Sequence, residues 1–303
     1  MAGYTDAPFR SLCHRHGATL CFAEMVSADG LAHDDAVTLR LLARAPGETL
    51  VGFQIFASGA ALAGQAVRRI APLAPSLIDL NCGCSVPKVL KTGCGAALMR
   101  SPALVGAMVA AMRAETDIPV TVKLRSGWDA GSPTWRACAE EAVKAGASMV
   151  TLHPRHRAQG FNGKAQWEQI GELKKAVPVP VTGSGDLFSA EDCAAMLSTT
   201  GCDAVMIARG CVGNPFIFDE TIALLCGGSA GAGAGPSVRL NAAMEHLRLL
   251  AETAGEEKAC RDMRKHFVAY TRGLPGGAVL RQSIVHASAV TEYEQIVESY
   301  LRE

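Results

Sequence analysis

Residues 179–185 read VPVTGSG, and residues 204–210 read AVMIARG. Each stretch is a short apolar run without regular polar alternation, which is typical of a parallel strand buried on both faces. Each run ends in a turn that contains glycine. In barrels built from parallel strands, the loops at the carboxyl ends of the strands carry the functional groups. These two stretches therefore predict parallel strands followed by functional loops.

Five further runs of the same kind precede these two. They cover residues 19–25, 50–56, 77–81, 119–125 and 149–155. Stretches with helical periodicity lie between them, and residues 58–74 and 101–116 each open with a serine that is expected to cap a helix. Strands that alternate with helices predict an α/β fold with a parallel sheet.

The seven strands fit a (β/α)8 TIM barrel that lacks its first strand. Residues 2–17 read as a turn and then a helix, at the point where a first strand would be ending. A doubly wound open sheet is the alternative, but no G-x-G-x-x-G turn follows any run. We therefore predict the barrel and expect translation to start upstream of Met1. The other interpretation, a barrel with an open seam, would leave strand edges unpaired.

The last third of the chain has no strand signal. Residues 226–237 read CGGSAGAGAGPS, a composition typical of a flexible linker. The following stretch has a helical period and ends at Gly255, an expected C-cap. We predict three parts, which are a barrel domain of residues 1–227, a linker of residues 228–237 and a small all-helical domain of residues 238–303.

Composition excludes several classes of protein. Hydrophobic residues make up 49% of the 303 residues and charged residues 19%, which argues against disorder. The formal net charge is zero, so only a local basic patch could bind nucleic acid. No apolar run has the length of a membrane span, and the N-terminus lacks the order of a signal peptide. Eleven cysteines, an odd number, favour a reducing compartment. We therefore expect a cytoplasmic monomer with no membrane partner.

Polar residues at the ends of the predicted strands are candidates for an active site, because these ends meet at one mouth of a barrel. Glycines in the last two loops would let backbone N–H groups approach an anion, and Arg209 adds a guanidinium. We therefore expect a ligand that carries a phosphate. The candidates are Gln54, Asp79, Asn81, Lys123, Arg125, His153, Arg155, Ser184–Asp186 and Ala208–Gly210.

Three cysteines lie in or beside the loop after residues 77–81. The spacing of Cys82, Cys84 and Cys94 does not match a zinc site, so no metal is expected. A disulfide between Cys82 and Cys84 would be strained and out of place in a reducing compartment. We interpret Cys84 as a single presented thiol, which is mostly protonated near neutral pH and can act as a general acid. Cys82 and Cys94 are interpreted as packing residues.

Seven segments resemble, in order, motifs of the tRNA-dihydrouridine synthases, most closely the bacterial general-type branch. The resemblance implies an FMN-dependent TIM barrel with a helical C-terminal domain. It also implies that NADPH, with NADH as the alternative, is the reductant for a tRNA uridine. The segments are MAGYTDAPFR (1–10), FQIFAS (53–58), LIDLNCGCSVPKV (77–89), VTVKLRSGW (120–128), TLHPRHRAQGFNG (151–163), VTGSGDL (181–187) and AVMIARGCVGNPFIF (204–218).

The resemblance also implies roles for individual residues. Cys84 would be the proton donor, and Asn81 would lie beside the target uridine. Further contacts to tRNA are expected from Lys88, Arg125, Arg264 and Lys265, with Tyr270 available for stacking. The implied flavin contacts are Met1, Ala2, Gln54, Lys123, His153, Ser184, Gly185, Asp186, Ala208 and Arg209.

This chain departs from the family pattern at four positions. Ser85 stands where the family has proline, Ser184 replaces asparagine, Ala208 replaces glycine and Pro154 replaces glycine. Two rival functions remain open. One is an FMN barrel enzyme that acts on a free pyrimidine or a small enone, and the other is an RNA-binding factor without flavin.

Overall fold

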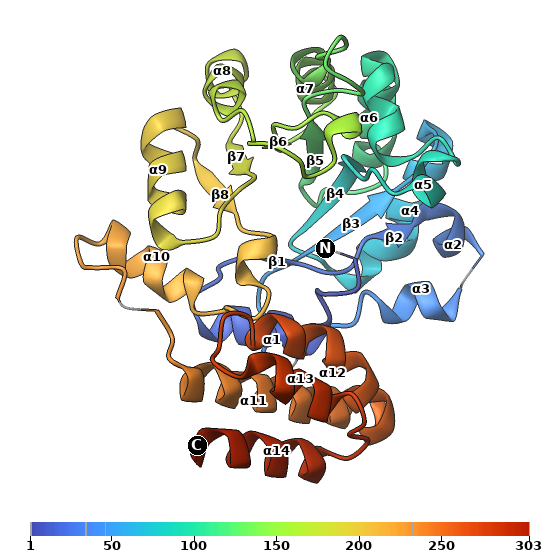
Figure 1. Ribbon diagram of the computed structural model, residues 1–303. Coiled ribbons are helices and arrows are strands. Elements are labelled where there is room, and N and C mark those ends of the chain that lie inside the picture. The colour runs from blue at the N-terminus through green and yellow to red at the C-terminus, as the bar shows by residue number, and fades with distance from the viewer. Residues whose placement is uncertain (1, 34, 46, 232, 303) are drawn as a thin grey trace.

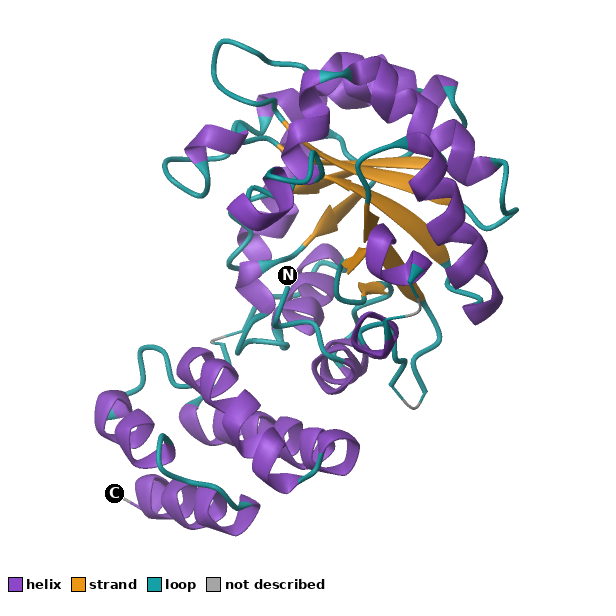
Figure 2. Cartoon of the chain, turned by 90° about the vertical axis from the view of Figure 1, so that its right-hand side faces the viewer, coloured by secondary structure: helices purple, strands orange, loops and turns teal. Residues whose placement is uncertain are grey.

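The computed structural model describes residues 2–33, 35–45, 47–231 and 233–302. Parallel strands form one curved sheet with helices on its outside, and a bundle of C-terminal helices lies at one end (Figures 1 and 2). The strands are β1 (Cys21–Phe22), β2 (Val26–Ser27), β3 (Val51–Phe56), β4 (Leu77–Cys82), β5 (Val120–Arg125), β6 (Met149–His153), β7 (Val181–Ser184) and β8 (Ala204–Met206).

The helices fall into two groups. Those around the sheet are α1 (Ala7–Arg15), α2 (Ala28–Ala32), α3 (Ala36–Arg40), α4 (Ala60–Ile70), α5 (Pro87–Leu90), α6 (Pro102–Arg113), α7 (Trp135–Lys144), α8 (Glu168–Ala176), α9 (Ala190–Thr200) and α10 (Ile217–Leu225). The C-terminal helices are α11 (Pro236–Ala254), α12 (Glu256–Tyr270), α13 (Gly277–Ile284) and α14 (Val290–Arg302). Short 3-10 turns are η1 (Ala71–Leu73), η2 (Gly95–Arg100), η3 (Arg157–Gln159) and η4 (Arg209–Cys211).

The order of the strands confirms the predicted barrel architecture and excludes the doubly wound sheet. From β3 to β8 each strand pairs in parallel with the next one in sequence, so the order never reverses as it would at a switch point. The run predicted over residues 19–25 is divided instead, because β1 and β2 are separate two-residue strands that both pair with β3. Within the described ranges no ladder joins β8 to β1, so a seam lies between them.

Neither serine that was expected to cap a helix makes a capping hydrogen bond. Helix α4 begins after Gly59 rather than Ser58, and no side chain caps it. Ser101 does precede α6, but its side chain makes no capping bond, and Pro102 at the first helical position favours the helical start instead. The expected C-cap at Gly255 is confirmed, with a φ of 82° that favours glycine.

Two apolar cores stabilise the molecule. The larger one fills the space between the strands and α4, α6 and α7, and the smaller one lies among α11, α12, α13 and α14. Helix α1 connects them, since it contacts α11 while Phe9 and Cys13 pack beside β1 and α10. Across the described residues, no helix combines the length and apolarity that a membrane crossing requires.

Candidate active site

Five of the predicted site residues lie at the carboxyl ends of successive strands. Gln54 belongs to β3, Asn81 to β4, Lys123 to β5, His153 to β6 and Ser184 to β7. Asn81 is paired directly with Lys123 across the ladder between β4 and β5, so both side chains lie on the same face of the sheet. The fold therefore brings together residues that are 130 positions apart in sequence, and it does so at the mouth of the barrel.

A continuous set of hydrogen bonds connects three strands to the cysteine loop. Thr121 Oγ1 donates to Asp79 Oδ1 at 2.6 Å, and Gln54 Nε2 donates to Asp79 Oδ2 at 2.7 Å. Asn81 Nδ2 donates to Gln54 Oε1 at 2.7 Å. Asn81 Oδ1 in turn accepts the backbone N–H of Cys84 at 2.8 Å. We call these residues the Asp79 chain. Asp79 was predicted as a site residue without a specific role, and Thr121 was not predicted.

Burial separates the three cysteines of this region. Cys84 is half-buried at the mouth, whereas Cys82 is fully buried and Cys94 is 5% exposed. Burial raises the pKa of the Cys82 thiol well above its ordinary value. All eleven cysteines of the chain are free thiols. This arrangement agrees with one presented thiol and two packing residues.

Positive charge gathers around His153. Burial lowers the pKa of this imidazole most, and the nearby Lys123, Arg125, Arg155 and Arg209 lower it further, to about 2. The ring is therefore neutral near neutral pH. Burial, together with Arg125, also lowers the pKa of Lys123 to about 8. An anionic ligand at this position would be attracted by the cations and would restore the full charge of the lysine.

The loops after β7 and β8 touch each other and need glycine. A Cβ on Gly185 would lie 2.8 Å from His153 Cδ2, and its φ of 118° also favours glycine. A Cβ on Gly210 would lie 2.0 Å from the carbonyl oxygen of Leu187. Ser184 Oγ donates to the carbonyl of Met206 at 3.0 Å, so this hydroxyl connects the two strands.

Asp186 holds two arginines at the edge of the mouth. Its Oδ2 accepts from Arg155 at 2.6 Å, and its Oδ1 lies 3.4 Å from the Arg209 guanidinium. The guanidinium of Arg209 also lies 4.5 Å from the ring centroid of Phe161. Ala208 is half-buried just before this arginine. Arg155 is 1% exposed, and its role in holding Asp186 was not predicted.

Arg125 joins two loops at the mouth. Its Nε donates to the carbonyl of Gly83 at 2.7 Å, and its Nη1 donates to the carbonyl of Gly160 at 2.9 Å. The side chain is 4% exposed. It therefore holds the cysteine loop at Gly83, the residue before Cys84.

The residues predicted to contact RNA lie on two surfaces. Lys88 is exposed in α5, and Lys265 is exposed in α12, where its ammonium lies 5.9 Å from the ring centroid of Tyr4. Arg264 is half-buried, with its Nη2 3.4 Å from the carbonyl of Ala287. Tyr270 is fully buried, so the expectation that it is available for stacking is wrong.

The N-terminal segment is anchored to Glu24, in the loop between β1 and β2. Glu24 accepts the backbone N–H of Gly3 at 2.7 Å and that of Thr5 at 3.1 Å. Ala2 is exposed beside this anchor. Met1, the other predicted flavin contact in this segment, lies outside the described residues.

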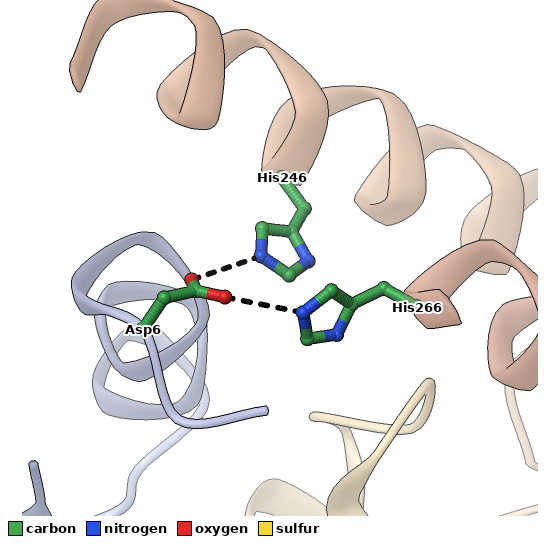
Figure 3. Close-up of side chains that lie close together, drawn as sticks. All are labelled: Asp6, His246 and His266. Carbon is green, nitrogen blue, oxygen red and sulfur yellow. Dashed lines mark hydrogen bonds and ion pairs between the residues drawn. The ribbon is translucent and has the colours of Figure 1, made fainter. Parts of the chain in front are cut away.

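One cluster between the domains was not foreseen. Asp6 Oδ1 lies 3.2 Å from His246 Nε2, and Asp6 Oδ2 lies 3.1 Å from His266 Nε2 (Figure 3). Both imidazoles are fully buried, and each Nδ1 lacks a partner in the described chain. Histidines that bind a metal usually donate the other ring N–H to an acceptor. The geometry therefore fits two rings whose Nε2–H groups donate to one carboxylate better than it fits a metal site.

Comparison with known proteins agrees with this geometry. A family model described as dihydrouridine synthase matches residues 1–303. A probable tRNA-dihydrouridine synthase of Treponema pallidum is 43% identical over 98% of this chain and 90% of its own length. The tRNA-dihydrouridine synthase B of Pseudomonas aeruginosa is 37% identical over 93% of this chain and 85% of its own length.

Among solved structures, the fold is similar to histamine dehydrogenase from Rhizobium sp. 4-9, with a TM-score of 0.54 and 13% identity. That alignment covers 82% of this chain and 47% of the dehydrogenase, so the present chain spans about half of its length. At this identity the likeness concerns the fold alone. The family match over the full length and the identity to the Treponema protein show that the chain belongs to the dihydrouridine synthase family.

Proposed function

We propose that this chain reduces the C5=C6 bond of uridines in tRNA, with a flavin as the hydride donor and Cys84 as the proton donor. Family membership supports the reaction, and two relatives that match most of the chain carry the name tRNA-dihydrouridine synthase. The single observation that carries the proposal is the half-buried Cys84 thiol at a mouth that also gathers four cations.

The residues at the mouth fit FMN. Within the described residues, Lys123 Nζ forms no hydrogen bond or ion pair, and this cation suits an electron-rich ring or an anion. Glycine at position 185 lets its loop pack against His153, and glycine at position 210 lets the next loop pack against Leu187, so the two loops meet beside Arg209. Backbone N–H groups of such loops could bind a phosphate. The walls of this site would be Ser184, Asp186 and Ala208. The guanidinium of Arg209 would bind the phosphate through two charge-assisted hydrogen bonds.

Bound FMN, reduced by NADPH or alternatively NADH, would supply a hydride to C6 of the uracil. Cys84 would then donate its proton to C5. The hydride, which carries two electrons and one proton, and this second proton together complete the addition across the C5=C6 bond. Gln54 and neutral His153 would hold the flavin by hydrogen bonds, and Ala2 would belong to the segment that covers it. Asn81 would contact the uridine beside Cys84.

The substrate side of the proposal uses exposed basic residues. Lys88 would meet the tRNA backbone near the mouth, while Arg264 and Lys265 would meet it on the helical domain. Arg125 would support the loop next to the uridine. Because Cys84 is half-buried, the target base would have to leave its stack to reach it. The enzyme would act as a cytoplasmic monomer.

Mapping of dihydrouridine tests the function directly. Transfer RNA from cells with and without the gene is compared position by position, and the gene is then restored as wild type or as Cys84→Ala. We expect specific positions to lose dihydrouridine without the gene and to regain it only with the wild type. An unchanged map would contradict the proposal.

An assay with purified protein separates the rivals. Wild-type protein is offered NADPH with either whole tRNA or free uridine. Reduction of free uridine alone would favour the small-molecule rival, and a colourless protein without flavin would favour the RNA-binding rival.

A further inference from the structure

The Asp79 chain has a direction that hydrogen-bonding chemistry imposes. The backbone N–H groups of Gly83 and Cys84 can only donate, so the Asn81 atom that faces them must be its oxygen. The amide nitrogen of Asn81 then faces Gln54 and leaves Gln54 Nε2 to donate to Asp79. A carboxylate oxygen at the far end is the acceptor that completes this order.

We propose that Asp79 is a positioning residue that fixes the amide of Gln54, the amide of Asn81 and, through them, the loop that carries Cys84. The inference rests on the proposed role of Cys84. Asp79 is 1% exposed and lies below the mouth, so it reaches the reacting groups only through other side chains. Without an acceptor at this position, Gln54 Nε2 loses its partner, and the Gln54 amide that accepts from Asn81 is no longer held from both sides.

The second donor to Asp79 makes one substitution tolerable. Thr121 has a hydroxyl that can accept as well as donate. In Asp79→Asn, the new amide nitrogen can therefore face Thr121 while the oxygen still accepts from Gln54. Asp79→Leu removes both acceptors and keeps the branched shape of the side chain. The pair Asn and Leu separates the hydrogen bond from the packing.

The first test measures the reactivity of the Cys84 thiol with iodoacetamide, followed by mass spectrometry of its peptide. We expect Asp79→Leu to change this rate about five- to tenfold, the equivalent of one lost hydrogen bond. Dihydrouridine formation should fall about 10- to 100-fold, as expected for a misplaced reacting group. Asp79→Asn should stay within about twofold of wild type in both measurements.

Thr151→Val is the matched control. Its hydroxyl is also buried on the neighbouring strand β6, but it has no hydrogen-bond partner in the described chain. This variant should leave Cys84 reactivity unchanged, whereas Thr121→Val should alter it slightly. Equal behaviour of Asp79→Leu and wild type would overturn the inference.

The second test reverses the direction of the hydrogen bonds in the Asp79 chain. It does not require the leucine variant to fold. Asn81→Asp places a carboxylate against Gln54 Oε1, and the other carboxylate at Asp79 prevents Gln54 from turning over. Adding Asp79→Asn removes that obstacle, so the reversed chain becomes complete. We expect the single variant to alter Cys84 reactivity and the double variant to restore it.

The readouts distinguish the two proposals. If the wild type forms no dihydrouridine, the proposed function fails, while the alkylation series still reports on the position of the loop. If the wild type is active and the double variant shows no recovery of Cys84 reactivity, the positioning role of Asp79 fails and the proposed function stands.

Discussion

Two aspartates, Asp79 and Asp6, each accept hydrogen bonds from two side chains, yet the pKa of the first is raised and the pKa of the second is lowered. Below the barrel mouth, burial raises the pKa of Asp79 to about 6, against the hydrogen bonds from Thr121 and Gln54. At the contact between the domains, burial also raises the pKa of Asp6. Hydrogen bonds from His246 and His266 outweigh that effect and hold it well below its ordinary value (Figure 3).

The difference shows what sets the charge of a carboxylate in this fold. Asp79 is 1% exposed, so desolvation outweighs the hydrogen bonds from Thr121 and Gln54 and the charge of Lys123. The Asp6 side chain is 28% exposed and also accepts the backbone N–H of Phe9 as the N-cap of α1. The mouth therefore holds a carboxylate for orientation, whereas the domain contact uses one for stability.

The largest expected effect concerns the chemistry at the mouth. Cys84→Ala should lower dihydrouridine formation by at least about a hundredfold, because a general acid typically contributes 10²–10⁴-fold. Flavin content and NADPH oxidation should remain, since neither needs a proton donor on the uracil face. Cys82→Ala and Cys94→Ala are the controls, and loss of activity in either with flavin retained would contradict the single-thiol interpretation.

The two aspartates should respond oppositely to the same substitution. Asp6→Asn should destabilise the folded protein at pH 7 by about 2 kcal/mol, because one imidazole N–H loses its charged acceptor. Asp79→Asn should instead stabilise it by on the order of 2 kcal/mol, since an ionised buried carboxylate is removed. Urea unfolding measures both.

Asp262→Asn is the control for this pair, because Asp262 forms an i,i+4 surface pair with Lys258 that should contribute little. If Asp6→Asn and Asp79→Asn shift the free energy of unfolding in the same direction, the contrast between the two sites is wrong. Flavin binding should be unchanged in Asp6→Asn, which separates the domain contact from the mouth.

A smaller effect is expected at the phosphate loops. Arg209→Ala should weaken FMN binding at least about tenfold, because a charge-assisted contact contributes roughly 1.5–3 kcal/mol. Fluorescence titration of the apoprotein with FMN measures it. Arg136→Ala, which removes an exposed cation from α7, should bind FMN as the wild type does. Equal affinities in the two variants would contradict the assignment of Arg209.

The smallest effect is a pH dependence at the domain contact. Burial lowers the pKa of His266 below its ordinary value of 6.5, although the hydrogen bond to Asp6 opposes this. The unfolded chain therefore binds more protons below about pH 6.5, and stability should fall as the pH is lowered. Urea unfolding between pH 8 and 5 measures this, and the free energy of unfolding should change less with pH in His266→Gln than in the wild type. An unchanged slope would assign the dependence to other groups.

Much of the mouth could be predicted because its signals are local. Each strand is a short apolar run, and a parallel sheet places the polar residue after each run at the same edge. Gln54, Lys123 and His153 were therefore found without tertiary information. Asp79 also stood among the candidates, but its role depends on which amide faces it, and that depends on three strands at once.

The sequence by itself determined the parallel α/β architecture, the helical C-terminal part and the presented thiol of Cys84, because periodicity and motif spacing act over a few residues. Only the tertiary structure decided the contact of Asp6 with His246 and His266, which lie 240 and 260 positions away in the chain. It also decided the burial of Tyr270, which no helical pattern revealed. The physical reason is that desolvation and hydrogen-bond partners are set by what packs against a residue, and these neighbours come from distant parts of the chain.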